Sequence, residues 1–364
     1  MSTSPKAGFS VAPISEFGRE EKIDLKRESQ YNFCTTGKFL KHSRGASPDV
    51  AAKDCAKKEE LRAMSIKNIT VIGLGNMGSA MATLLLKAGY RVTGYDIVGE
   101  KVSGLVPLGL KPARSPKEAS RRADLVILSL RTWEIIKTVV EGTNGILDAA
   151  KPGQIIADMS TVPPWETKAM AERLSKKGID WMDIPISGSA AQTRVGNMVF
   201  MAGGKKSAFN KIKPVLDSIG KKTVYVGKSG DAAMLKIVVN TILFLNQAAA
   251  IEGFVLGLKA GLDPDVMFEV ISSGAAGSNL IDARGQDMLA GDFKLKGGIG
   301  LKDVGLTLAS AERLQVMLPM SALYRQLMLQ AFYSGLFGQD GTVVMRIYEQ
   351  LAGIKRKYKG PFKR

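Results

Sequence analysis

Two regions of the chain differ in how their apolar residues are spaced. From residue 65 to about 226, short apolar runs alternate with amphipathic segments, as expected for strands of a parallel sheet joined by helices. The predicted strands are 69–72, 91–95, 124–129, 154–158, 179–184, 198–203 and 223–226. The predicted helices are 76–88, 116–122, 132–140, 164–177 and 206–219. We therefore expect an α/β protein whose N-terminal part is a doubly wound, Rossmann-type sheet with right-handed crossovers.

The strand pattern disappears after residue 230. One long apolar helix is predicted at 230–258, followed by helical segments near 264–273, 277–290, 301–316, 320–334 and 342–353. An all-helical domain with this much apolar surface must bury it somewhere, and a second subunit is the obvious place. We expect a homodimer or homotetramer formed through this domain.

The two ends of the chain differ from the rest. Residues 1–63 are rich in Ser, Lys, Glu and Ala without a sustained period, which indicates a disordered extension. The predicted organisation is this extension, a dinucleotide-binding domain at 64–227, a helical substrate and dimerisation domain at 228–354, and a frayed basic tail at 355–364.

A glycine-rich turn follows the first predicted strand. Gly73, Gly75 and Gly78 have the Gly-x-Gly-x-x-Gly spacing, with Asn76 and Met77 between them. In dinucleotide-binding folds the first glycine makes the tight turn, the second lets a pyrophosphate approach, and the third lets helix and strand pack closely. An ordinary strand-turn-helix is the alternative, but the flanking strand and helix favour a dinucleotide site.

The end of the next strand indicates which dinucleotide binds. Asp96 follows the 91–95 strand, where a carboxylate accepts hydrogen bonds from a ribose diol and repels a 2′-phosphate. No arginine follows it directly, although Arg91 and Lys101 are near in sequence. We therefore expect NAD in preference to NADP.

The rare residue types narrow the chemistry. His42, Cys34 and Cys55 all precede Met64, so the rest of the chain has no histidine or cysteine. This excludes histidine acid–base catalysis, a thiol nucleophile and the usual Cys/His zinc sites there, so no metal is expected. The absence of a disulfide framework fits a reducing cytoplasm, and no apolar run approaches the roughly 20 residues of a membrane span. The net charge of +17 suits an anionic cofactor and a small anionic substrate; nucleic acid is not the expected partner.

Three later stretches carry candidate polar groups. Ser160 and Thr161 follow a strand and could bond a nicotinamide ribose or cap a helix. Ser187 and Gly188 follow another strand, where a hydroxyl and exposed backbone N–H groups suit a carboxylate, although a plain polar loop is the alternative.

The third stretch lies on the long apolar helix. Lys236 and Asn240 are four residues apart and share one face among apolar neighbours. Desolvation would lower the pKa of such a lysine toward the working pH, as a general acid–base requires. A lysine on a helix is otherwise usually solvated.

Together these motifs resemble the β-hydroxyacid dehydrogenase family, which includes 3-hydroxyisobutyrate dehydrogenases, tartronate semialdehyde reductases and glyoxylate/succinic semialdehyde reductases. The matching stretches are 73–78, 158–161, 183–188, 236–240 and a Lys-Asp pair at 302–303. The resemblance implies hydride transfer between NAD(P) and a small 3-hydroxy acid or its semialdehyde, and a C-terminal domain like that of 6-phosphogluconate dehydrogenase. It implies that Lys236 is catalytic and that Ser187, Gly188 and Asn240 bind substrate. The implied cofactor contacts are Gly73, Gly75, Asn76, Met77, Gly78, Asp96, Leu130, Thr161 and Lys302.

Some positions depart from the family pattern. Ser189 replaces a second glycine, a Gly-Ala pair near 192–193 is missing, and Arg131 stands where relatives often have proline. These departures leave the particular substrate open. Two alternatives to the dehydrogenase are a catalytically silent binding module on the same fold and an imine reductase-like enzyme. Imine reductases generally replace the lysine, so Lys236 counts against that alternative.

Overall fold

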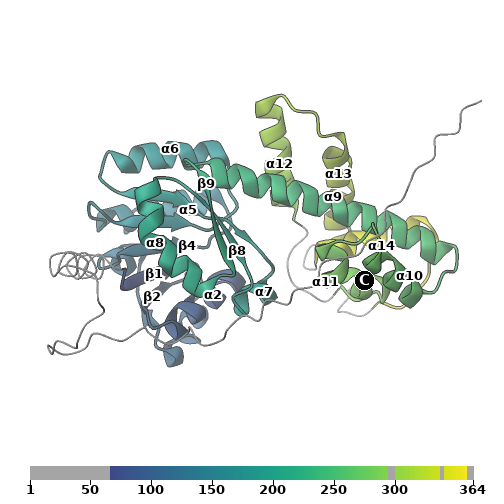
Figure 1. Ribbon diagram of the computed structural model, residues 1–364, viewed down its shortest axis with the longest axis horizontal. Helices are drawn as coiled ribbons and strands as arrows, with labels where there is room; N and C mark the ends of the chain where they lie inside the picture. The colour runs from purple at the N-terminus through teal and green to yellow at the C-terminus, as the bar shows by residue number, and fades with distance from the viewer. Residues whose placement is uncertain (1–65, 294–299, 337–339, 359–364) are drawn as a thin grey trace, which may run out of the picture. The chain divides into compact units, whose positions relative to one another are not determined.

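The computed structural model describes residues 66–293, 300–336 and 340–358 (Figure 1). The predicted extension 1–63 and residues 359–364 of the predicted tail lie outside these ranges. The described residues belong to one compact unit.

The sheet forms because the buried apolar runs pair side by side in parallel. Its strands are β1 (Asn68–Ile72), β2 (Arg91–Tyr95), β3 (Lys111–Pro112), β4 (Leu125–Leu128), β5 (Ile155–Asp158), β6 (Asp180–Asp183), β7 (Ile186–Ser187), β8 (Val199–Gly203) and β9 (Lys222–Gly227). Their order is β3-β2-β1-β4-β5-β6-β8-β7, with β9 paired to β8. The strands from β3 to β6 are parallel, whereas β8 runs antiparallel to β6 and β7 and parallel to β9. The chain therefore winds outward from β1 in both directions, which confirms the predicted α/β, Rossmann-type fold.

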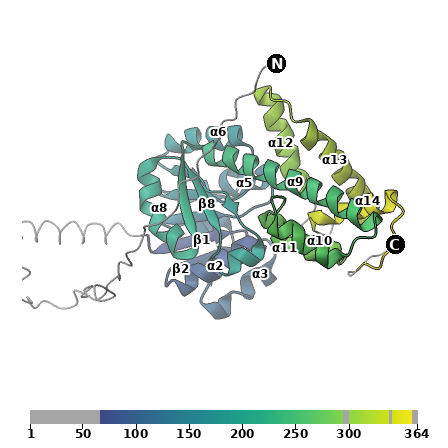
Figure 2. The ribbon, with the colours of Figure 1, turned by 45° about the vertical axis from the view of Figure 1, so that its right-hand side comes forward.

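Helices cover both faces of this sheet (Figure 2). They are α2 (Asn76–Lys87), α3 (Gly99–Ser103), α4 (Pro116–Ser120), α5 (Trp133–Glu141), α6 (Pro164–Ser175), α7 (Ala190–Arg194) and α8 (Lys206–Ile219). Val71 of β1 belongs to the same core as Met81 of α2 and Ile212 of α8. The next residue, Ile72, belongs to a second core with Met170 of α6. Successive side chains of a strand point to opposite faces, so each central strand supplies both cores.

The helical half begins with the long predicted helix, α9 (Asp231–Lys259), which is followed by α10 (Pro264–Ser273), α11 (Asn279–Leu289), α12 (Leu301–Leu314), α13 (Pro319–Ala331) and α14 (Met345–Leu351). Phe254 of α9, Met288 of α11 and Tyr324 of α13 share its core. By length and composition alone, α9 could cross a membrane. Most of its apolar stretch is not buried inside the protein.

Residues 355–358, the described part of the predicted tail, contact the helical half. The Arg356 guanidinium forms an ion pair with the fully buried Glu349. The Tyr358 hydroxyl donates to the same carboxylate at 2.6 Å, and its ring packs against the helical core. A buried acid partner of this kind cannot be inferred from a basic run alone.

Candidate active site

The glycine turn between β1 and α2 has the geometry that a dinucleotide requires. Gly73 has a φ of 89°, in the left-handed region that favours glycine. A Cβ on Gly78 would lie 1.8 Å from the Gly73 carbonyl oxygen, so the third glycine is needed for close packing. A Cβ on Gly75 would meet no protein atom within 4 Å, so the chain leaves space beside that backbone. Gly75 precedes α2 and has no side chain that could cap the helix, and the first turn of α2 has no acidic residue. The first N–H groups of α2 and the positive end of its dipole can therefore interact with a pyrophosphate.

Asp96 is anchored where β2 meets this turn. One carboxylate oxygen accepts from the Leu74 N–H at 2.8 Å, and the other accepts from the Val98 N–H at 2.9 Å. The Lys101 ammonium lies 3.4 Å from the second oxygen. The side chain is 8% exposed, so the carboxylate is held at a fixed place beside the glycine turn. This fits the predicted ribose position, although the same carboxylate also supports the protein backbone.

The turns after β4 and β5 are joined to each other. The Leu130 N–H donates to the Ser160 hydroxyl at 3.0 Å, and the Ser160 N–H donates to Asp158 at 3.0 Å. Leu130 also touches the glycine turn, because its side chain lies 2.9 Å from where a Gly73 Cβ would be. Asp158 is completely buried, and burial raises its pKa to about 6 against the lowering effect of the Ser160 hydrogen bonds. The buried carboxyl group of Asp158 thus connects the two turns that carry the predicted cofactor contacts Leu130 and Thr161.

The predicted substrate stretch lies between β6 and α7. Ser187 ends β7 and is partly buried, and the exposed Gly188 has a φ of 147°. Ser189 caps α7: its hydroxyl accepts from the Gln192 N–H at 3.2 Å, and the Gln192 side chain accepts from the Ser189 N–H at 2.8 Å. The Thr193 hydroxyl lies 3.6 Å from the sulfur of Met77 in the glycine turn. The departures at Ser189 and at 192–193 therefore form a short capped helix that packs on α2.

The predicted catalytic pair lies on α9, the helix that contacts β6, β7 and β8. Lys236 is partly buried and Asn240 is 4% exposed. Burial lowers the pKa of Lys236; the negative charge of Asp303 opposes this effect and the positive charge of Lys302 adds to it. An ammonium in this position loses its proton more readily than a solvated lysine, which suits proton transfer.

The Lys-Asp pair brings α12 to the same region. The Lys302 ammonium lies 2.7 Å from the Asp303 carboxylate and donates to the Thr161 carbonyl at 2.7 Å. Lys302 and Thr161, which are 141 residues apart in sequence, are thus in direct contact. The ammonium of Lys302 bonds the backbone of the turn after β5, where the predicted nicotinamide end would lie.

Three carboxylates of this region were not predicted as site residues. Asp158 and Asp183 are buried neighbours on β5 and β6, and Asp303 acts on Lys236 through its charge. Asp158 and Asp183 could have been noticed from the sequence, because each lies at or beside the end of a predicted buried strand. Charged residues are seldom buried without partners. Nothing in the local sequence connects Asp303 to Lys236.

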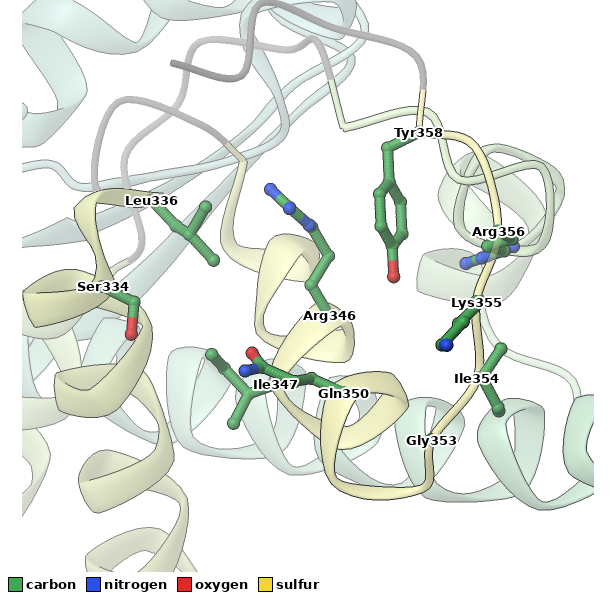
Figure 3. A pocket seen from close by; sticks show the side chains of 10 residues that line it. All are labelled: Ser334, Leu336, Arg346, Ile347, Gln350, Gly353, Ile354, Lys355, Arg356 and Tyr358. Atoms are coloured by element: carbon green, nitrogen blue, oxygen red, sulfur yellow. The ribbon is translucent and has the colours of Figure 1, made fainter. Parts of the chain in front are cut away.

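A separate cavity of about 460 Å³ lies in the helical half (Figure 3). Arg346, Gln350 and Tyr358 are among its lining residues, and the Arg346 guanidinium lies over the Tyr358 ring at 4.4 Å. None of the predicted site residues lines it.

Comparisons with known proteins identify the family of the chain. Residues 68–227 match a family profile described as the NAD binding domain of 6-phosphogluconate dehydrogenase. Residues 230–348 match one described as the NAD-binding domain of NADP-dependent 3-hydroxyisobutyrate dehydrogenase. The chain is 37% identical over 295 residues to 2-(hydroxymethyl)glutarate dehydrogenase from Eubacterium barkeri, covering 80% of this chain and 97% of that one. It is 34% identical over 271 residues to 3-hydroxyisobutyrate dehydrogenase from Pseudomonas aeruginosa, covering 71% and 90%.

Solved structures extend the comparison. A 3-hydroxyisobutyrate dehydrogenase from Salmonella typhimurium is similar with a TM-score of 0.72 and 27% identity, covering 77% of this chain and 99% of that one. An imine reductase from a Pseudomonas species, at 19% identity and a TM-score of 0.51, shares the fold alone. With the glycine turn, the lysine helix and the Lys-Asp pair in place, the chain belongs to the β-hydroxyacid dehydrogenase family of NAD(P)-dependent oxidoreductases that act on CH–OH groups.

Proposed function

We propose that this enzyme interconverts a small 3-hydroxy carboxylate and its semialdehyde, with Lys236 as the group that transfers the proton. The observation that carries this proposal is a partly buried lysine on a helix face shared with the buried Asn240, beside Lys302 and Asp303. Burial favours the neutral amine, so Lys236 can accept the hydroxyl proton during oxidation and return it during reduction.

The other residues of the site hold the substrate in place for this step. The Asn240 amide and the Ser187–Gly188 turn offer donors for a carboxylate, so the hydroxyl carbon would be directed toward the nicotinamide end of the site. When bound, the nicotinamide cofactor supplies the acceptor or donor of the hydride. Lys302 supports this end by bonding the Thr161 carbonyl at 2.7 Å.

The chemistry of the relatives supports a 3-hydroxy acid. Both 3-hydroxyisobutyrate and 2-(hydroxymethyl)glutarate, named for two similar proteins, carry a primary alcohol two carbons from a carboxylate carbon. One carboxylate held by the Ser187–Gly188 turn and one hydroxyl beside Lys236 would serve either molecule. The imine reductase-like and silent alternatives would need no lysine at this place.

We favour NAD as the cofactor. The Asp96 carboxylate is fixed beside the glycine turn, and a 2′-phosphate placed there would meet its negative charge. Lys101, at 3.4 Å from that carboxylate, partly offsets the repulsion. We also propose that the enzyme works in the cytoplasm, where NAD and small hydroxy acids meet.

The experiment is a spectrophotometric screen of NADH formation. Full-length protein is incubated with NAD⁺ and 3-hydroxyisobutyrate, 2-(hydroxymethyl)glutarate, glycerate, 3-hydroxypropionate, 4-hydroxybutyrate or serine. The proposal expects turnover of at least one 3-hydroxy acid, and less turnover with NADP⁺. No turnover of any of these acids with either cofactor, and none of the matching aldehydes with the reduced cofactors, would refute the proposed substrate class.

We also propose that a second copy of the chain covers the exposed apolar surface of α9, α12 and α13. The side chains concerned are more than a third exposed, although α12 and α13 pack on α9. They are Val238, Ile242, Leu243, Leu256, Leu314, Met320 and Leu323. Light scattering after size exclusion should give at least twice the 39.1 kDa of one chain. A monomer, or recovery of the protein with membranes, would contradict this interpretation.

A further inference from the structure

The helix that carries Lys236 has no cap from its own sequence. Gly230 occupies the position before α9, with a φ of 93°, and has no side chain to accept a hydrogen bond. The first N–H groups of a helix have no partner within it and need one from elsewhere. Asp231 does not serve, because its carboxylate accepts from the Lys228 N–H in the preceding turn.

Asp183 supplies the missing acceptors from another part of the fold. One of its carboxylate oxygens accepts from the Gly230 N–H at 3.0 Å, and the other accepts from the Ala233 N–H at 2.9 Å. Those donors are 47 and 50 residues away in sequence. A negative charge at this end of α9 also interacts favourably with the helix dipole.

The Asp183 carboxylate lies in a confined, buried place between two strands. Asp183 is 1% exposed at the end of β6, with Asp158 as its neighbour on β5 and Gly203 as its neighbour on β8. A Cβ on Gly203 would lie 2.7 Å from a carboxylate oxygen of Asp183. A glycine therefore makes the room for this carboxylate, and any larger residue would displace it.

The position of Asp183 connects the two parts of the proposed site. Ala233 is three residues before Lys236, about one helical turn, so its hydrogen bond fixes the first turn of α9 and the direction of the lysine. Asp183 is also four residues before Ser187, in the stretch that carries the proposed substrate turn. Asp303 and Lys302 act on Lys236 through their charges, whereas the direct contact of Asp183 with α9 is made with the Gly230 and Ala233 N–H groups.

We propose that Asp183 is a positioning residue for the reaction, holding the Lys236 helix in register with the Ser187–Gly188 substrate turn. This inference rests on the proposed function for its kinetic consequence. Its structural consequence, the direction and burial of Lys236, can be measured without any substrate.

The main test variant is Asp183→Asn. The amide keeps the shape but can accept through one atom only, and it turns an NH₂ donor toward the second N–H group. The expected result is a fall in kcat of about 100-fold with little change in cofactor affinity, since displacement of a reacting group by about 1 Å can have that effect. Gly203→Ala is the second variant, because it keeps the charge and displaces it, and it should lower kcat in the same direction.

Asp263→Asn is the matched control. Asp263 accepts from the Asp265 and Val266 N–H groups at the start of α10, which carries none of the proposed site residues. It should change thermal stability without changing kcat. Comparing kcat at matched folded fractions separates positioning from stability.

The substrate-free readout is the pH dependence of Lys236 labelling by an amine-reactive reagent, measured by peptide mass spectrometry. Asp183→Asn and Gly203→Ala should move the labelling midpoint upward, toward that of an exposed lysine, while Asp263→Asn should not. Unchanged labelling and kcat in folded Asp183→Asn would overturn the inference, as would failure of both site variants to fold. If wild-type protein turns over no substrate but the labelling shifts as expected, the proposed function fails while the positioning role stands.

Discussion

The sheet half, residues 66–227, buries alternate side chains of its central strands against helices on both faces, whereas the helical half leaves much of its longest helix exposed. The sheet half supplies rigid turns at the ends of strands, where backbone and glycine geometry leave room for a dinucleotide. The helical half carries Lys236, Asn240 and Lys302, and Lys302 contacts the turn after β5. In the proposed mechanism the sheet half therefore holds the cofactor and the substrate carboxylate, and the helical half contributes the lysine that transfers the proton.

The largest predicted effect is the loss of activity when Lys236 is removed. Lys236→Ala should lower kcat by about 10²–10⁴-fold, because general acid–base groups contribute about that much. Cofactor affinity should stay close to wild type, since the glycine turn lies in the other half. Steady-state kinetics and calorimetric cofactor titration measure the two effects.

Lys259→Ala is the control for that variant. Lys259 lies at the other end of α9 and donates to the Ala352 carbonyl at 2.7 Å. It should leave kcat unchanged. Equal losses in both variants would mean that α9 is sensitive to any substitution and that Lys236 has no special role.

The second prediction concerns the buried carboxyl group beneath the cofactor turns. Burial raises the pKa of Asp158 from 3.8 to about 6, so its ionisation opposes folding. That penalty, about 3 kcal/mol, is fully present above about pH 6 and is relieved as the pH falls toward 4. Asp158→Asn should remove this contribution, so urea unfolding between pH 4 and 7 should depend less on pH than in wild type. An unchanged pH dependence would contradict the burial of a titrating Asp158.

The smallest predicted effect concerns the cofactor turn. Gly75→Ala should weaken cofactor binding about tenfold, or about 1.4 kcal/mol, because the new Cβ occupies space left for the pyrophosphate. Thermal stability should change little, because that Cβ meets no protein atom within 4 Å. Gly253→Ala on α9, which also meets none, is the control and should leave cofactor binding unchanged. Equal affinity in Gly75→Ala and wild type would place the cofactor elsewhere.

Much of the fold could be predicted from sequence because its signals are local. The long helix predicted at 230–258 is α9 at Asp231–Lys259, and the predicted strand 198–203 is β8 at Val199–Gly203. The two-residue strands β3 and β7 and the five-residue helices α3 and α7 were missed, because such short elements have no period to detect. The Ser189-x-x-Gln192 capping signature of α7 was nevertheless readable.

The candidate site was predictable in its motifs and not in its connections. Lys236 and Thr161 were recognisable from their own stretches, but the contact of Lys302 with Thr161 spans 141 residues. The capping of α9 by Asp183 likewise spans 47 residues and depends on Gly203 leaving room. Such contacts join elements that are distant in sequence, α12 with the turn after β5 and α9 with β6, so no single stretch specifies them.

The most direct test of the account is the pH profile of kcat for oxidation of the best 3-hydroxy acid, in wild type and in Lys236→Ala. If Lys236 accepts the proton, wild-type kcat should rise with pH through an ionisation below the ordinary pKa of lysine, because burial lowers that pKa. The residual activity of Lys236→Ala should lack this step. The same ionisation in both proteins would contradict the claim that the lysine on α9 carries the proton.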